Sequence, residues 1–355
     1  MNKKLVLLFV FTTILYQLHG QIPNQQHYIC TRTIGQLSID GKLDEESWQK
    51  ATWTEKFVDI EGDLKPKPLY ETRAKMLWDD DYFYIAAKIY EPHIWATLTE
   101  RDAVIFQDND FEVFIDPDGD THKYYEFEIN ALGTIWDLML GKPYRDGGPV
   151  INAWDIRGLK KGIQIEGTLN DPSDEDDFWT VELAFPWKVL KEAARRTPKG
   201  GDQWKVNFSR VNWRVDAGAT YSKAKDPATG KRYPEFNWVW SPQGAINMHM
   251  PENWGIVQFS MKDAGTTNIE YQTPDGEPIK YLLRKVYYAQ RKFYRTNKRY
   301  ATDLKELDIP DIDTDQAKKI SLGATFSQFE AIHVSDNGDT WHIIQDGKVW
   351  RTNRK

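Results

Sequence analysis

The sequence predicts an antiparallel, all-β sandwich followed by a small α+β module, for three reasons. From about residue 33 to 260, short runs of alternating apolar and polar residues are separated by clusters of Asp, Gly, Asn and Pro, the pattern of an antiparallel all-β domain. Residues 261–278 are rich in Gly, Thr, Pro and Asp, as expected of a linker. At the start of residues 279–355, apolar residues recur at helical spacing, and the segment ends with short strands between tight turns. This pattern predicts a helix packed on a β-meander.

The first twenty residues have the layout of a signal peptide. Two lysines precede an apolar run at 5–16, and a short polar stretch ends at Gly20. The run has about twelve residues, fewer than the ~20 that a membrane-spanning helix needs. We therefore expect cleavage near Gly20 and export to the periplasm or the exterior, with an uncleaved anchor as the alternative. No later stretch is long and apolar enough to span a membrane. Cys30 is the only cysteine, so no intramolecular disulfide is expected.

Turn residues and proline divide the predicted sandwich into strands and two short helices. Asp44 is the expected N-cap of a helix that directs Trp48 onto the sheet. Asp79–Asp81 forms the turn of a hairpin whose second strand alternates apolar residues inward. Pro186 ends a strand because it cannot donate to a β-ladder, and a second short helix follows at 187–194. Further strands are expected at 133–138, 163–169, 179–185, 206–211, 238–242 and 254–259.

The most informative feature is the polar face of one predicted hairpin. Strand 110–116 turns through 117–120 into strand 124–130. Side chains alternate between the two faces of a strand, so apolar positions share one face and the remaining positions share the other. The first set is Phe111, Val113, Ile115, Tyr125, Phe127 and Ile129, and the second is Glu112, Phe114, Glu126, Glu128 and Asn130.

Folding this hairpin at its turn places Glu112 roughly opposite Glu128. Like charges directly opposed across a strand pair are destabilising. The fold must therefore supply a cation, an arginine, a shared proton or a hydrogen-bonding ligand. This polar face is the candidate site.

A basic helix is expected at the start of the C-terminal module. Leu282, Val286, Ala289 and Phe293 recur at helical spacing, and residues 279–305 contain nine Lys or Arg and one acidic residue. The basic side of this helix is expected to be solvated, to dock on the acidic sandwich, or to bind an acidic polysaccharide. The strands of the meander are expected at 331–334, 341–344 and 349–351.

Composition limits the function classes. The formal net charge is −7, which argues against general nucleic-acid binding and suits attraction of cations. The chain holds 15 Trp, 17 Tyr and 16 Phe, and such rings serve hydrophobic cores and sugar-stacking platforms alike. The sequence has no Ser-His-Asp order and no HExxH pattern, so it offers no signature of a serine hydrolase or a zinc protease.

Several phrases in shared order resemble carbohydrate-binding module family 9, a β-sandwich related to the DOMON superfamily. They are Ile39-Asp40-Gly41, Leu43-Asp44-Glu45 with Trp48, Leu77-Trp78-Asp79 before Tyr82–Tyr84, Asp110–Asp116, Glu182–Trp187 and Trp254-Gly255. Their span runs from Ile34 to Ser260. The resemblance implies an immunoglobulin-like or DOMON-like sandwich over residues 33–260.

In sugar-binding members, the resemblance implies a slot in which two aromatic rings sandwich a terminal sugar while polar groups bind its hydroxyls. The polar positions fall on Glu112 and Asn130, and the first aromatic position falls near Phe106. Two departures change the expected site. Glu128 stands where the family places an arginine, and the position of the second tryptophan falls near Met248 and His249.

Arg210 has two expected roles. It either points into the slot and neutralises Glu112 and Glu128, or it forms a purely structural buried ion pair. Phe106 is expected to stack on the sugar, and Met248 with His249 to form the opposite wall. The predicted carbohydrate-binding residues are therefore Phe106, Glu112, Glu128, Asn130, Arg210, Met248 and His249.

We expect an exported, non-catalytic protein that binds a glycan end or small saccharide, with a polysaccharide or oligosaccharide as its partner. The competing interpretation is a protein-interaction or surface-assembly module that has lost sugar binding, because the second tryptophan is missing. A glycoside hydrolase would use two of Glu112, Glu126 and Glu128 as acid and base. Met248-His249-Met250 could offer haem ligands as in some DOMON relatives, although a Met-rich connection is more often core filler.

No cofactor is assigned, and calcium is left open. Asp116, Asp118 and Asp120 could bind it, as some family members bind calcium. The EF-hand pattern requires Gly at its sixth position and an acidic residue at its twelfth, where Thr121 and Phe127 stand here. A hairpin turn is therefore the favoured interpretation of these three residues, and a calcium site built from the backbone and Asp residues near the N-terminal region stays open.

Overall fold

The computed structural model describes residues 25–274, 276–312 and 314–352, so the predicted signal segment at 1–20 lies outside the described residues. Within them, thirteen strands form one continuous sheet. These strands are β1 (His27–Arg32), β2 (Val58–Asp59), β3 (Thr72–Trp78), β4 (Tyr82–Tyr90), β5 (Asp110–Asp116), β6 (Tyr124–Asn130), β7 (Ile135–Leu140), β8 (Val150–Ile151), β9 (Lys160–Glu166), β10 (Phe178–Pro186), β11 (Gln203–Asn212), β14 (Phe236–Val239) and β15 (Gly255–Asp263). A separate small hairpin consists of β12 (Val215–Ala217) and β13 (Tyr221–Lys223).

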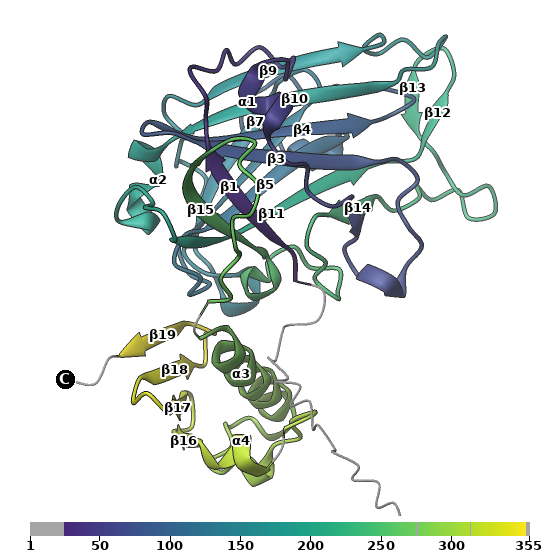
Figure 1. Ribbon diagram of the computed structural model, residues 1–355. Coiled ribbons are helices and arrows are strands. Elements are labelled where there is room, and N and C mark those ends of the chain that lie inside the picture. Colours follow the sequence, from purple (N-terminus) through teal and green to yellow (C-terminus); the bar gives the residue numbers. More distant parts are fainter. Residues whose placement is uncertain (1–24, 275, 313, 353–355) are drawn as a thin grey trace, which may run out of the picture.

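The sheet forms two packed layers (Figure 1). Its strand order is β8-β7-β6-β5-β11-β15-β1-β3-β4-β10-β9, and β14 and β2 extend from β11. The prediction of a mostly β-sheet fold is confirmed. Neighbouring strands pair antiparallel except at β1, which pairs in parallel with both β15 and β3 and so joins the layers. This strand precedes the expected start of the sandwich at residue 33, and its two distant partners leave no local sequence signal.

The hydrophobic core lies between the two layers. Phe111, Val113 and Ile115 of β5 belong to the same buried cluster as the inward residues of β4 and β10. Across the layers, the rings of Phe127 and Phe185 meet edge to face with centroids 5.4 Å apart. The expected alternation along the hairpin is therefore confirmed, and its polar set lies on the outer face of this layer.

Two short helices pack against the sandwich. These are α1 (Glu46–Lys50) and α2 (Trp187–Ala194), near the two helices expected from the sequence. Trp48 of α1 is fully buried, and its Nε1 donates to Glu182 Oε1 of β10 at 2.7 Å. This bond satisfies a carboxylate on an otherwise apolar stretch of strand.

The C-terminal residues form a helix packed on a four-stranded sheet. The elements are α3 (Glu277–Asn297), α4 (Thr314–Lys318), β16 (Ile320–Ala324), β17 (Phe329–Val334), β18 (Thr340–Ile344) and β19 (Val349–Thr352). Leu283 and Val286 of α3 share a buried cluster with Ala331 and Ile343 of the sheet. Within the described part of the chain, none of the helices combines the length and apolar character needed to cross a bilayer.

The basic helix α3 docks on the sandwich (Figure 1). At its start, Glu277 Oε2 lies 2.8 Å from Lys205 Nζ of β11. Further along, Arg291 Nη1 lies 2.6 Å from Oδ1 of Asp146, in the 3₁₀ turn η3 (Tyr144–Asp146). Of the expectations for this helix, docking on the acidic sandwich is the one that the contacts support.

Candidate functional site

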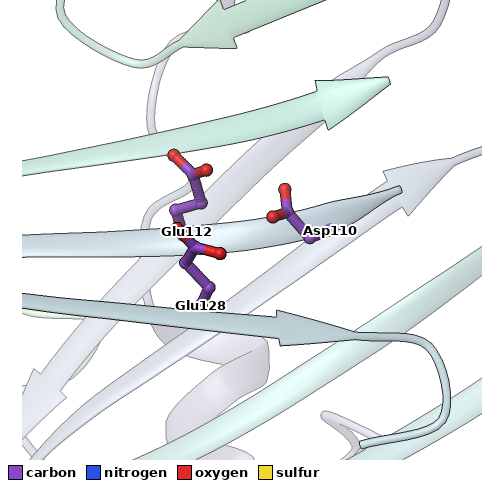
Figure 2. A group of neighbouring side chains, drawn as sticks. All are labelled: Asp110, Glu112 and Glu128. Carbon is purple, nitrogen blue, oxygen red and sulfur yellow. The ribbon is translucent and has the colours of Figure 1, made fainter. Parts of the chain in front are cut away.

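The outer face of β5 and β6 gathers acidic side chains. Glu112 pairs directly with Glu128, and Asp110 pairs with Asn130 one step along the ladder. Asp110, Glu112 and Glu128 are at most 6% exposed. Figure 2 shows that their carboxylates converge on the same side of the two strands. We call these three residues the acidic cluster. The predicted opposition of Glu112 and Glu128 is confirmed.

Burial and mutual repulsion favour the protonated forms of this face. Burial raises the pKa of Glu112 to about 7, against a hydrogen bond from Ser209 that lowers it. Burial, followed by the charge of Glu112, raises the pKa values of Asp110, Glu126 and Glu128 well above their usual range. The fold therefore holds these carboxyls in an environment that disfavours their charge.

Local hydrogen bonds fix the acidic cluster without balancing its charge. The backbone N–H of Val211 donates to Asp110 Oδ1 at 3.0 Å, and that of Phe106 donates to Glu128 Oε2 at 3.0 Å. Among the described residues, Asp110 Oδ2 and Glu126 Oε2 are buried without a hydrogen-bond partner. Two oxygens on one face are thus free to receive a ligand.

The structure gives Asn130 a structural role. Its Nδ2 donates to Leu98 O at 2.9 Å and to Asp108 Oδ2 at 3.0 Å. Its Oδ1 accepts from the N–H groups of Leu132 at 3.1 Å and Thr134 at 3.0 Å. An amide has two donor hydrogens and two acceptor lone pairs, so these four bonds use its whole capacity. The predicted hydrogen bond from Asn130 to a sugar is not available unless an internal bond breaks.

Arg210 forms no ion pair with the acidic cluster, although its charge acts on Asp110. It shares the inward face of β11 with Phe208 and is fully buried. Its Nη1 donates to Tyr90 O at 2.8 Å, and its Nη2 lies 3.6 Å from Glu91 Oε2. The expected neutralising role is wrong, because the period of two turns this side chain to the other side of the sheet. The alternative, a structural buried ion pair, is the one observed.

Phe106, Met248 and His249 lie near the polar face. Phe106 is half-buried in the 3₁₀ turn η2 (Ile105–Gln107), beside Glu128 through its backbone. Met248 packs against the buried cluster that holds Phe114. His249 Nε2 lies 3.9 Å from Glu126 Oε1, and its Nδ1 lies 2.9 Å from Tyr124 Oη. Burial and then Arg145 lower the pKa of His249 to about 4, so it is neutral at pH 7.

Two aromatic residues beside this face were missed by the sequence prediction. Tyr144 in η3 is 50% exposed, and its ring meets that of His249 edge to face with centroids 4.4 Å apart. Trp136 of β7 pairs directly with Glu128 and is half-buried. The period of two on β7 could have placed Trp136 here, whereas the loop that carries Tyr144 has no such signal.

The second acidic group lies in the hairpin turn between β5 and β6. Asp116 accepts hydrogen bonds from the N–H groups of Gly119 at 3.1 Å and Thr121 at 2.9 Å. Asp120 Oδ2 lies 3.2 Å from Lys348 Nζ of the C-terminal module. One oxygen each of Asp116, Asp118 and Asp120 lies within 4.8 Å of the others. The turn interpretation accounts for the hydrogen bonds of Asp116, and a lysine already faces this group.

The fold and the polar face together define a β-sandwich domain with a candidate ligand site on the outer side of one layer. Residues 39–208 match the family described as "Carbohydrate family 9 binding domain-like". Residues 39–208 of the sandwich thus resemble this family, and the predicted family resemblance is confirmed.

Two curated relatives share part of this chain. Exoglucanase XynX of Acetivibrio thermocellus is 24% identical over 168 residues, which are 46% of this chain and 12% of that protein. Endo-1,4-beta-xylanase C of Paenibacillus barcinonensis is 30% identical over 92 residues, 26% of this chain and 8% of that protein. The chain thus matches only a small part of each relative's length.

Among solved structures, the chain is similar to a family 9 carbohydrate-binding module from Caldicellulosiruptor kristjanssonii in complex with cellotriose. The identity is 14%, the TM-score is 0.41, and the match covers 69% of this chain and all of the other.

Proposed function

We propose that this chain is an exported, non-catalytic protein that binds a glycan end or a small saccharide on the outer face of β5 and β6. The observation that carries the proposal is that this buried polar face lies inside residues 39–208, the family 9-like domain. Carboxylates are suited to paired sugar hydroxyls. The relatives' names, an exoglucanase and an endo-1,4-beta-xylanase, make β-linked glucan and xylan oligosaccharides the first candidates.

The geometry suggests which groups contact the sugar. Tyr144 offers a half-exposed ring beside Glu126 and Glu128. Burial, followed by the charges of these two carboxylates, raises the pKa of Tyr144 to about 12. An aromatic ring stacks on the C–H face of a pyranose. Glu112 presents a buried carboxylate to hydroxyl donors. We therefore assign stacking to Tyr144, hydrogen bonding to Glu112 and Glu128, and side walls to Phe106 and His249.

A glycan array followed by calorimetry tests this function. Residues 21–355 would be screened on oligosaccharides, and hits titrated against wild type, Glu112→Gln and Glu166→Gln. Glu166 lies exposed at the end of β9, so it controls for charge removal alone. We expect saturable binding that Glu112→Gln weakens at least tenfold, about 1.4 kcal/mol, and that Glu166→Gln leaves unchanged. Equal loss in both variants would move the site elsewhere, and release of reducing sugar would contradict a non-catalytic role.

The second candidate is a protein-interaction or surface-assembly module. The observation that favours it is the absence of a tryptophan at Met248 and His249, both of which are engaged internally. Met248 O accepts from Trp254 Nε1 at 2.9 Å, and His249 O accepts from Arg145 Nη1 at 2.7 Å. A folded protein that binds no glycan on the array would support this function.

A further inference from the structure

The acidic cluster has the size of a cation site. Asp110, Glu112 and Glu128 each place one carboxylate oxygen within 4.8 Å of the others. Three converging carboxylates suit calcium, which takes about 6–8 oxygen ligands, better than magnesium, which is usually held by only one or two carboxylates. The ligands are all oxygen, as hard cations prefer.

Protein cations approach this cluster without pairing with it: the charge of Arg210 lowers the pKa of Asp110, against the larger effect of burial, which raises it. In the part of the chain that the structure describes, no Lys, Arg or His forms an ion pair with any of its three carboxylates. Arg210 lies on the inward face with Glu91, and Arg145 Nη2 lies 2.9 Å from Glu252 Oε2. His249 approaches Glu126 at 3.9 Å, but its low pKa leaves it neutral at pH 7.

A second observation points to a ligand. Asp110 is fully buried, and its Oδ2 has no hydrogen-bond partner among the described residues. Glu126 is not a member of the cluster, yet it lies one step along the same face of β6 and is 5% exposed. Its Oε2 is also buried and without a partner. An unpaired buried oxygen is costly, and a cation held by the cluster would satisfy Asp110.

We propose that Asp110, Glu112 and Glu128 bind a calcium ion on the outer face of β5 and β6. Three carboxylates supply more charge than one divalent ion removes, which favours tight retention. They also leave several of the ion's 6–8 oxygen positions to water or other oxygens. The site stands without the proposed sugar binding.

Calcium titration of the full chain after EDTA treatment tests this site. Calorimetry and melting curves would compare wild type, Asp110→Asn, Glu128→Gln and Asp118→Asn. Asp118 belongs to the separate acidic group of the hairpin turn, so it is the matched control. We expect calcium to bind and to raise the melting temperature of wild type and Asp118→Asn. In Asp110→Asn and Glu128→Gln we expect calcium to bind at least tenfold more weakly and to raise the melting temperature much less.

Three outcomes would overturn the site. They are no calcium effect on wild type, undiminished calcium binding in both cluster variants, and loss of binding in Asp118→Asn alone, which would place the ion in the turn. The melting temperature of Glu128→Gln without calcium shows whether that variant is folded. Glycan binding is measured separately, so calcium binding without glycan binding rejects only the proposed function, and the reverse rejects only the calcium site.

Discussion

Glu112 and Glu128 lie directly opposite each other on β5 and β6, and both are nearly fully buried. The strand pairing forces this proximity, because opposed positions on an antiparallel ladder have Cβ atoms about 4.5–5.5 Å apart. The local hydrogen bonds from Phe106 and Ser209 orient the two carboxyls without adding positive charge. The pair is therefore a source of strain that a bound cation or a shared proton relieves.

Removing one charge of this pair should stabilise the calcium-free protein. In EDTA at pH 8, we expect Glu128→Gln to raise the free energy of unfolding by about 0.2–1 kcal/mol, the range for cross-strand pairs. The amide keeps an oxygen that accepts from the Phe106 N–H. Urea denaturation would measure the change, and Glu166→Gln on the exposed end of β9 should show none. A loss of stability in Glu128→Gln would mean that the charge is already balanced in the fold.

Asn130→Ala should destabilise the protein, because it removes four hydrogen bonds that tie η2's loop and the turn after β6 to the sheet. A buried partner left unsatisfied costs about 1–3 kcal/mol. Urea denaturation beside calorimetry would separate the two roles of this residue. Unchanged stability together with lost glycan binding would instead show that the amide contacts the ligand directly.

The sequence was sufficient for the local geometry of the polar face. A period of two and a short turn fix both the alternation and the register of a hairpin, which is why the opposition of Glu112 and Glu128 could be predicted. The position of Arg210 could not be predicted in this way, because the face that it shares or does not share with Glu112 depends on which residue of β11 pairs with β5. That residue is Ser209, and a non-local pairing of this kind has no local signal.

The roles of residues whose partners lie in loops could likewise not be predicted from the sequence. Asn130 is saturated by Leu98 and Asp108, which lie on either side of η2, and by the turn after β6, while Tyr144 reaches the polar face from a loop held by distant contacts. Strand β1 was missed for the same reason, because its parallel partners β15 and β3 are far away along the chain. The local sequence pattern predicts which face of its own strand a residue occupies and where turns fall. The pairing of strands that are distant in the sequence determines which of these faces come into contact.

Tyr144→Ala should weaken glycan binding while leaving the fold intact. Its ring is half exposed and is the aromatic surface beside Glu126 and Glu128, so its loss removes a stacking platform. We expect about tenfold lower affinity, which corresponds to about 1.4 kcal/mol. Calorimetry would measure it, with Phe326→Ala as control, because Phe326 is an exposed aromatic of the C-terminal module. Equal affinity in wild type and Tyr144→Ala would exclude stacking at this ring.

The contact between Lys205 and Glu277 should contribute to docking in a pH-dependent way. Both side chains are buried, with Nζ and Oε2 2.8 Å apart. Burial would raise the pKa of Glu277, but Lys205 and Lys280 outweigh it and lower the pKa to about 2. Burial lowers the pKa of Lys205 despite its partner. The intact pair therefore contributes little to the free energy of unfolding. Removing one partner should lower that free energy by roughly 3–5 kcal/mol, as in other buried pairs, because the remaining charge is left unpaired.

The sign of the pH effect follows from the lowered pKa of Glu277. The folded state holds this carboxyl ionised, so its contribution is complete above about pH 4.5, the ordinary value, and falls as the pH drops toward 2. We expect Glu277→Gln to melt below wild type at pH 7, and the gap to shrink between pH 4.5 and 3. Differential scanning calorimetry of both proteins would measure it. A gap that widens on acidification would contradict the assigned pair.

Docking of α3 should also hold the wall of the candidate site. Tyr287 Oη and Arg291 Nη1 both lie 2.6 Å from Asp146 Oδ1. The adjacent Arg145 donates through Nη1 to His249 O at 2.7 Å. The helix is thereby connected to the two loops that carry Tyr144 and His249, although it contributes no side chain to the acidic cluster.

Arg291→Ala should therefore loosen those two loops without touching the cluster. We expect a lower melting temperature, faster hydrogen exchange in residues 142–147 and 247–253, and a several-fold loss of glycan affinity with calcium binding retained. Arg295→Ala is the matched control, because Arg295 lies exposed about one turn further along α3. Exchange rates in these loops that match those of wild type would show that α3 docks without supporting the site. Lost calcium binding would show that the cluster depends on the same network.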